Sequence, residues 1–359
     1  MADNVVSAFG TSEIRDYDKL LREFGVESFS KVKLSEPLII MRRAKVFGQR
    51  DLKSVINAMK NGKRFAVVSG IKPSSQLHIG SKLIVDQIVY FQNHGGLVYY
   101  PIADLESLVD NGLELDKARL LARDNLLDLA ALGIDFKKAR IYFQSEEVKV
   151  QRLAYVYSRN VTNNMLKAIY GEHPIGMYMA ALIQVADILL PQIEHGPMPV
   201  VVPVGFDQDP HIRLTRDIAV KHGLVPPSST YVKFISSLLG VERKMSKREP
   251  QGMIMLSESP KDARKKIMKY AFSGGQATVE AHRKKGGDPD VDVAYQYLTY
   301  FESDDKKLKK VFDDYKAGRL LSGELKVILA DKIESFLIEH QAKRKKAEVM
   351  VDKFLKKTL

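Results

Sequence analysis

The spacing of apolar residues predicts alternating strands and helices over the first two thirds of the chain. Apolar runs of strand length alternate there with stretches of helical spacing, and the runs lie at 65–68, 97–102, 139–143, 200–204 and 231–235. The run at 200–204 is apolar on both faces, which is typical of a buried parallel strand. We therefore predict an α/β fold with a Rossmann-type parallel sheet.

Further elements are expected around this sheet. The pattern predicts helices at 17–24, 51–59, 116–132 and 211–221, a strand or hairpin at 38–47, and a helical insertion at about 145–195 with a break at 171–174. From Ser259 onward the sequence is helical and rich in lysine, with no further strand pattern. We therefore predict an N-terminal extension and lead-in at 1–60, a Rossmann catalytic domain at 61–258 and an all-α C-terminal domain at 259–359.

The stretch from 65 to 96 carries the first chemical signal. A strand is followed by the polar loop 72–76 and by a helix that begins near His78 and Gly80. The first N–H groups of a helix and the positive end of its dipole can hold a phosphate, and glycine lets a ligand approach the backbone. The His78 ring could donate to a phosphate oxygen, although on this stretch alone a surface histidine is an equal alternative.

Carboxylates follow two of the predicted strands. Asp104 and Glu106 come directly after 97–102, and Asp207 with Gln208 follows 200–204. Ligands of open α/β sheets bind where the parallel strands end. We therefore expect these side chains at a binding site, with helix capping or loop solvation as the alternative for Asp104 and Glu106.

Composition narrows the classes of function. The 359 residues include 56 Lys and Arg against 44 Asp and Glu, and the resulting net charge of +12 suits a polyanionic partner. The absence of cysteine excludes disulfides, thiolate zinc sites and a cysteine nucleophile. No apolar run approaches the ~18 residues of a membrane span, and the first residues lack a signal-sequence pattern. We expect a cytoplasmic protein with no membrane contact.

Two short motifs resemble the signatures of class I aminoacyl-tRNA synthetases. The segment Pro73-Ser-Ser…His78-Ile-Gly-Ser81 is similar to their HIGH motif. The segment Lys244-Met-Ser-Lys-Arg248, in a loop at 243–252, is similar to their KMSKS motif. Ser81 and Arg248 depart from the last residue of each signature. A hydroxyl at a helix start can still donate and an arginine adds phosphate affinity, so we expect activity to survive.

This resemblance implies an aminoacyl-tRNA ligase that uses ATP, with Mg²⁺ carried by the ATP and no dedicated metal ligands from the protein. Positioning and positive charge carry adenylate formation, because no proton need move in that step. The resemblance implies catalytic roles for His78, Lys244 and Lys247. The implied ATP-binding residues are Lys72, Ser75, His78, Gly80, Ser81, Asp207, Gln208, Lys244, Met245, Ser246 and Lys247.

The rest of the chain sharpens the resemblance. Segments at 204–217, 271–275, 280–283, 290–293, 322–326 and 339–341 are very similar to archaeal and eukaryotic tryptophanyl-tRNA synthetases, whereas 69–74 and 185–190 look like the bacterial enzymes of that family. The resemblance implies activation of tryptophan, tRNA(Trp) as partner, a homodimer formed through the insertion, and anticodon binding by 259–359. The implied tryptophan-binding residues are Val68, Gly70, Glu106, Gln184, Asp187, Val202, Val204 and Gly205, with Asp187 accepting the indole N–H.

Two alternatives remain open. Gln184-Val-Ala-Asp187 also resembles the tyrosyl-tRNA synthetases, although the small Val68 favours a bicyclic ring over a phenol. The second alternative is a catalytically silent paralogue that binds RNA, which the retained signature residues disfavour. A carboxylate buried at position 187 is costly unless a group donates to it, and we expect the ligand to be that donor.

Overall fold

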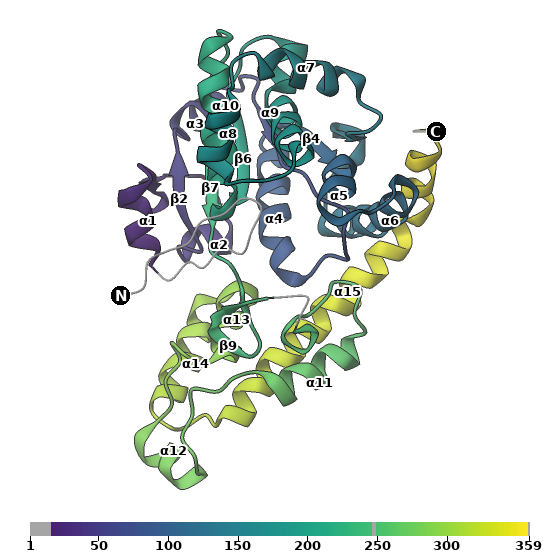
Figure 1. Cartoon of the computed structure of the whole chain (residues 1–359). Coiled ribbons are helices and arrows are strands. Elements are labelled where there is room, and N and C mark those ends of the chain that lie inside the picture. The colour runs from purple at the N-terminus through teal and green to yellow at the C-terminus, as the bar shows by residue number, and fades with distance from the viewer. Residues whose placement is uncertain (1–15, 246–248, 358–359) are drawn as a thin grey trace.

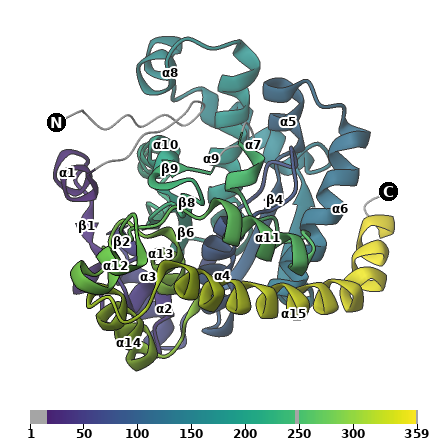
Figure 2. The same cartoon turned by 90° about the horizontal axis from the view of Figure 1, so that it is seen from below.

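The computed structural model describes residues 16–245 and 249–357 (Figure 1). A seven-stranded sheet covered by helices forms one part of the molecule, and the part that follows in the chain is built mainly of helices. The long helix α15 (Ser322–Lys357) runs from the helical part back to α6 (Leu115–Leu132) of the α/β part (Figures 1 and 2). The predicted fold class, an α/β sheet with a helical insertion followed by an all-α region, is confirmed.

The sheet has the strand order β1-β2-β7-β6-β3-β4-β5. Its strands are β1 (Glu27–Ser28), β2 (Val46–Arg50), β3 (Ala66–Val68), β4 (Leu97–Ile102), β5 (Ala139–Phe143), β6 (Val200–Gly205) and β7 (Ser228–Val232). The five strands from β7 to β5 are parallel, whereas β1 and β2 add an antiparallel edge, for which the sequence pattern indicated only a strand or hairpin at 38–47. The chain builds outward in opposite directions from β3 and β6, so the switch point at which such sheets bind ligands lies between these two strands.

Two apolar layers sandwich the sheet, because successive side chains of a strand point to opposite faces. Val67 packs in the layer with α4 (Ile79–Asn93) and α6, whereas Val68 packs in the layer with α9 (Ile175–His195). The other helices of this part are α1 (Tyr17–Glu23), α2 (Ile39–Arg42), α3 (Lys53–Lys60), α5 (Asp104–Asn111), α7 (Val148–Ser158), α8 (Asn163–Tyr170) and α10 (Asp209–Lys221), with 3₁₀ turns at Phe29–Lys31, Phe136–Lys138 and Phe206–Gln208.

The predicted insertion is helical, as expected, and consists of α7, α8 and α9. Helix α9 is apolar nearly all round. Among the described residues it is the one helix long and apolar enough to cross a membrane, but 78% of its most apolar stretch is buried inside this fold. An all-round apolar helix buried in this way is typical of the core of a large globular protein.

Two predicted strands were misplaced. The segment 38–47 contains the helical turn α2 before β2 begins at Val46, because a run of only four apolar residues does not distinguish a helix from a strand. The strand predicted at 231–235 starts earlier, at Ser228. Two of its three buried serine and threonine hydroxyls form hydrogen bonds, for example Thr230 Oγ1 to Gln87 Oε1 at 2.8 Å, so polar residues can occupy a central strand.

The C-terminal part begins with a small hairpin of β8 (Ser236–Ser237) and β9 (Gly240–Lys244) and a 3₁₀ turn at Pro250–Gly252. The following helices are α11 (Pro260–Tyr270), α12 (Val279–Lys285), α13 (Val293–Phe301), α14 (Asp305–Lys316) and α15. Figure 2 shows α15 passing beneath the α/β part towards α6. Apolar residues of α4, α6, α13 and α15 belong to one continuous core, so the two parts are packed against each other.

Neighbouring residues of α15 test this packing. Leu337 is fully buried and Ile338 is 58% exposed. We expect Leu337→Ala to lower the free energy of unfolding by about 2–5 kcal/mol, because it removes core contacts and leaves a cavity. The matched control Ile338→Ala should change it by less than about 0.5 kcal/mol. Urea unfolding measures both, and equal losses for the two variants would contradict the observed packing.

Candidate functional site

His78 lies at the start of α4, at the carboxyl end of β3. It is the N-cap residue, with extended backbone, and its Nδ1 accepts a hydrogen bond from Gly80 N at 3.0 Å. A neutral ring in this arrangement carries its proton on Nε2. A Cβ added at Gly80 would lie 2.7 Å from the His78 ring, so glycine is required here by the histidine itself.

The first N–H groups of α4 are already bonded within the protein. Ile79 N donates to Ile254 O at 3.0 Å, Gly80 N donates to His78 Nδ1, and Ser81 N donates to His78 O at 2.9 Å. The expectation that these amides are open to a phosphate therefore differs from the structure. The dipole of the 15-residue helix still favours an anion at this end.

The segment that carries His78 pairs through its backbone with residues 254–256. Besides the bond from Ile79 to Ile254, Leu256 N donates to Leu77 O at 2.9 Å, and His78 forms an isolated bridge with Met255. Residues 254–256 follow the predicted KMSKS-type loop, so this pairing holds the loop's downstream end against the start of α4. The loop itself leaves from β9, a strand that the sequence analysis missed. The predicted residues Ser246 and Lys247, together with Arg248, lie outside the described residues.

Lys244 and Asp207 face each other at the mouth of the site. Lys244 Nζ is 4.0 Å from Asp207 Oδ2 and 4.1 Å from the centre of the Phe234 ring. Burial raises the pKa of Asp207, and the nearby Lys244 charge opposes that shift. Met245, the next residue of the loop, is buried. A cation beside a carboxylate at the end of β6 suits a ligand with both hydroxyls and phosphates.

Lys72 is already paired with carboxylates of α5. Its Nζ lies 3.2 Å from Glu106 Oε1 and 2.5 Å from Asp110 Oδ2. Burial raises the pKa of Glu106, and the Lys72 charge counteracts it. To contact ATP as predicted, Lys72 would have to leave these two ion pairs. Asp104, at the start of α5, is joined to the chain after β5, because its Oδ1 accepts a hydrogen bond from Ser145 N at 3.1 Å. This contact agrees with the alternative of a capping role for Asp104.

Asp187 is buried in the middle of α9 and both of its oxygens have protein donors. Tyr142 OH donates to Oδ1 at 2.8 Å and Gln144 Nε2 donates to Oδ2 at 2.6 Å. Burial raises the Asp187 pKa to about 7, although these two hydrogen bonds lower it. We expected the ligand to be the donor to this carboxylate, whereas the structure shows two donors from the protein itself. Both donors belong to the end of β5, and no local pattern indicated this long-range pairing.

The other residues predicted to bind the amino acid line the end of the sheet around Asp187. Val68, Val202 and Val204 are buried on the α9 side of β3 and β6. Gln184 Nε2 donates to Gln208 Oε1 at 3.3 Å, which connects the predicted amino-acid and ATP residues. Glycine is needed at position 70, where a Cβ would lie 2.7 Å from Pro101 O, and at position 205, where it would lie 2.5 Å from Asp207 Oδ1.

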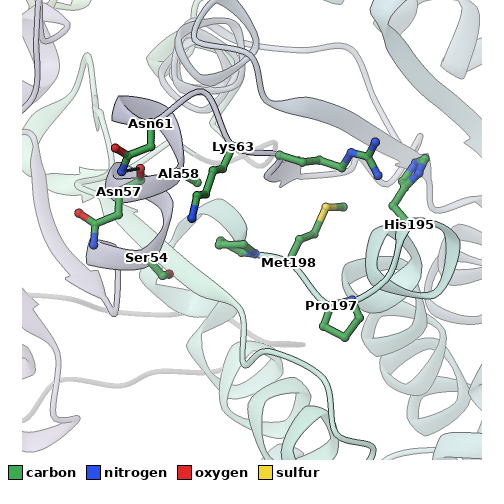
Figure 3. Close-up of a pocket in the computed structure, with 10 residues that line it drawn as sticks. Ser54, Asn57, Ala58, Asn61, Lys63, His195, Pro197 and Met198 are labelled. Atoms are coloured by element: carbon green, nitrogen blue, oxygen red, sulfur yellow. Dashed lines mark hydrogen bonds between the residues drawn. The ribbon is translucent and has the colours of Figure 1, made fainter.

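A surface cavity of about 690 Å³ lies at the opposite end of the sheet (Figure 3). Figure 3 shows Asn57, Asn61 and Lys63 on one side of it and His195 and Met198 on the other. Pro199, which also lines it, precedes β6 and accepts a hydrogen bond from Ala66 N at the start of β3. None of the predicted site residues lines this cavity, and ligands of such sheets bind at the other edge.

Comparisons with known proteins agree with one another. A family model described as tRNA synthetases class I (W and Y) matches residues 60–338. The tryptophan–tRNA ligase of Methanocaldococcus jannaschii is 39% identical over 96% of this chain and 96% of that protein, and that of Aeropyrum pernix is 40% identical over 99% of both. The crystal structure of tryptophanyl-tRNA synthetase from Aeropyrum pernix K1 gives a TM-score of 0.89 at 39% identity and covers 97% of this chain and 98% of that chain.

The raised pKa of Asp187 has a consequence for stability. A folded-state pKa of about 7 lies above the ordinary value of 3.8 for an aspartate side chain, so the folded chain holds a proton that the unfolded chain releases. The contribution of Asp187 to stability is therefore full below about pH 4 and falls as the pH rises towards 7. Asp187→Asn has no such titration, since its amide stays neutral. The unfolding free energy of the wild type minus that of Asp187→Asn should fall from pH 4 to 7.5. A difference that stays constant over this range would contradict the raised pKa of Asp187.

Proposed function

The chain belongs to the class I tRNA synthetases for tryptophan and tyrosine, and we propose that it activates tryptophan with ATP at the carboxyl edge of its sheet and transfers it to tRNA(Trp). The observation that carries the location of this site is the backbone pairing of 77–79 with 254–256. It brings the helix start that carries His78 next to the loop that begins at Lys244.

ATP would bind between these two segments, and Mg²⁺ would enter the site bound to the ATP. His78 would donate through Nε2 to a phosphate oxygen, and the dipole of α4 would favour the same charge. Lys244 would leave Asp207 and meet the charge that develops at phosphorus, while Asp207 would accept from the ribose hydroxyls. Lys247 and Ser246 are assigned to the same loop by the signature. The protein would thus act by positioning and by positive charge.

Tryptophan would bind at the end of β3 and β6, with Asp187 within reach of its indole N–H. A carboxylate has about four acceptor positions, and Tyr142 and Gln144 use two of them. Asp187 can therefore still accept from an indole N–H, now as part of a fixed network of three side chains. Val68, Val202 and Val204 would form the apolar wall, Gly70, Gly205 and Glu106 the rim, and Gln184 the contact to the amino group.

Other proposals concern assembly and organisation. The insertion exposes apolar side chains, including Tyr155 at 70% and Ile175 at 78%, which supports a homodimer formed through this region. Light scattering measures the mass of the assembly directly.

The regions 1–60, 61–258 and 259–359 are proposed as lead-in, catalytic and anticodon-binding domains, although β2 of the first region pairs with β7 of the second. We place the protein in the cytoplasm.

Pyrophosphate exchange with each of the twenty amino acids tests the function. We expect ATP–pyrophosphate exchange that depends on tryptophan. A preference for tyrosine would overturn the amino-acid assignment, and no exchange with any amino acid would favour the silent RNA-binding paralogue.

Lys244→Ala tests the catalytic assignment in the same assay. Loss of a charge that meets the transition state costs roughly 2–4 kcal/mol, so kcat for exchange should fall by about 30- to 1000-fold. Tryptophan binding should stay near the wild-type value, because Lys244 lies on the ATP side. Lys309→Ala, an exposed position on α14, is the control. Wild-type exchange by the Lys244 variant would refute the role.

A further inference from the structure

A buried polar cluster joins α15 to α6. Arg344 donates to the carboxylates of Asp124 and Asp128 and, at 3.2 Å, to the backbone oxygen of Asp124. His340 Nε2 lies 2.8 Å from Asp128 Oδ1 and, because an ionised carboxylate oxygen only accepts, the ring nitrogen is the donor. Asp128 is fully buried and His340 is 2% exposed.

This cluster fixes the position of α6 relative to α15. A buried charge is costly unless it is paired and hydrogen-bonded. Displacing α15 would leave the Asp128 carboxylate without its donors inside the core. The cluster therefore ties the two helices together.

Asn125 extends this connection to the nucleotide loop. It lies on α6 within one turn of both aspartates and is fully buried. Its Nδ2 donates to the backbone oxygen of Ser75 at 3.0 Å. Ser75 belongs to the loop that leads from β3 to His78. The position of this loop thus depends on a side chain of α6.

The same turn of α15 also reaches the other side of the site. Gln341 Nε2 donates to the backbone oxygen of Glu258 at 2.5 Å. The Glu258 carboxylate in turn accepts from Met255 N at 3.2 Å, and Met255 bridges to His78. Residues 340–344 therefore hold both the loop before His78 and the segment paired with it.

We propose that Asn125 is a positioning residue for ATP binding and that the Asp128–His340–Arg344 cluster sets its placement. This inference rests on the proposed function, since it assigns Ser75 and His78 to the ATP site. It makes α15, a helix that lies outside the catalytic region, a determinant of ATP affinity. Neither Asn125 nor the cluster touches the reacting atoms, so the effect is on binding geometry.

Asn125→Ala tests the proposal in pyrophosphate exchange. Loss of one buried hydrogen bond should raise the KM for ATP by roughly three- to tenfold and leave the KM for tryptophan unchanged. His340→Leu should act in the same direction. His340→Gln should restore the wild-type KM, because the glutamine Nε2 can still donate to Asp128.

Arg123→Ala provides the matched control. Arg123 and Asp352 form an ion pair between the same two helices, with Nε 2.6 Å from Oδ1, but the pair is partly exposed and has no bond to the loop. Exposed pairs contribute little to stability. This variant should keep the wild-type KM for ATP, and thermal unfolding should show that all variants are folded.

The outcomes separate the two levels of the proposal. A wild-type chain without exchange would overturn the proposed function and this inference with it. An active wild type whose folded Asn125→Ala variant keeps its KM for ATP would overturn the inference alone. Equal rises in both KM values, or the same effect in Arg123→Ala, would also overturn it, because they indicate general loosening. If His340→Leu does not fold, Asn125→Ala and His340→Gln decide.

Discussion

The site depends on the short backbone pairing between residues 77–79 and 254–256. Its two hydrogen bonds, at 3.0 and 2.9 Å, join the start of α4 to the segment after the Lys244 loop. Residues 77–79 belong to the α/β part of the molecule, and residues 254–256 lead into α11. This contact sets where the start of α4 lies relative to the chain that follows the 243–252 loop, and the proposed ATP site rests on it.

Two buried carboxylates hold the neighbouring helices in place on either side of this pairing. Asp187 ties α9 to Tyr142 of β5 and to Gln144, which follows β5. Asp128 ties α6 to α15, and its neighbour Asn125 contacts the loop before His78. In both cases donors of the protein reach the buried carboxylate, Asp128 through Oδ1 alone, and they offset part of the cost of burial. A site that works by positioning needs such rigid supports.

Local pattern was sufficient for the elements with strong periodicity or a capping residue. The β3–α4 opening, the apolar β6 and the all-helical region after Ser259 were predicted, as was the position of His78 at the start of a helix. What failed depends on partners distant in sequence. In the polar strand β7, the hydroxyls of Ser228 and Thr230 donate to Asp51 O and Gln87 Oε1. The pairing of Lys72 with α5 and the donors of Asp187 arise in the same way, and periodicity does not report them.

Amide hydrogen exchange at Ile79 and Leu256 tests the central pairing most directly. The N–H of Ile79 is in the first turn of α4 and has no partner inside the helix, so its protection reports the bond to Ile254 alone. We expect both amides to exchange slowly and together in the free chain, and more slowly with ATP and tryptophan. Exchange of either amide at the rate of an unbonded loop N–H would contradict it.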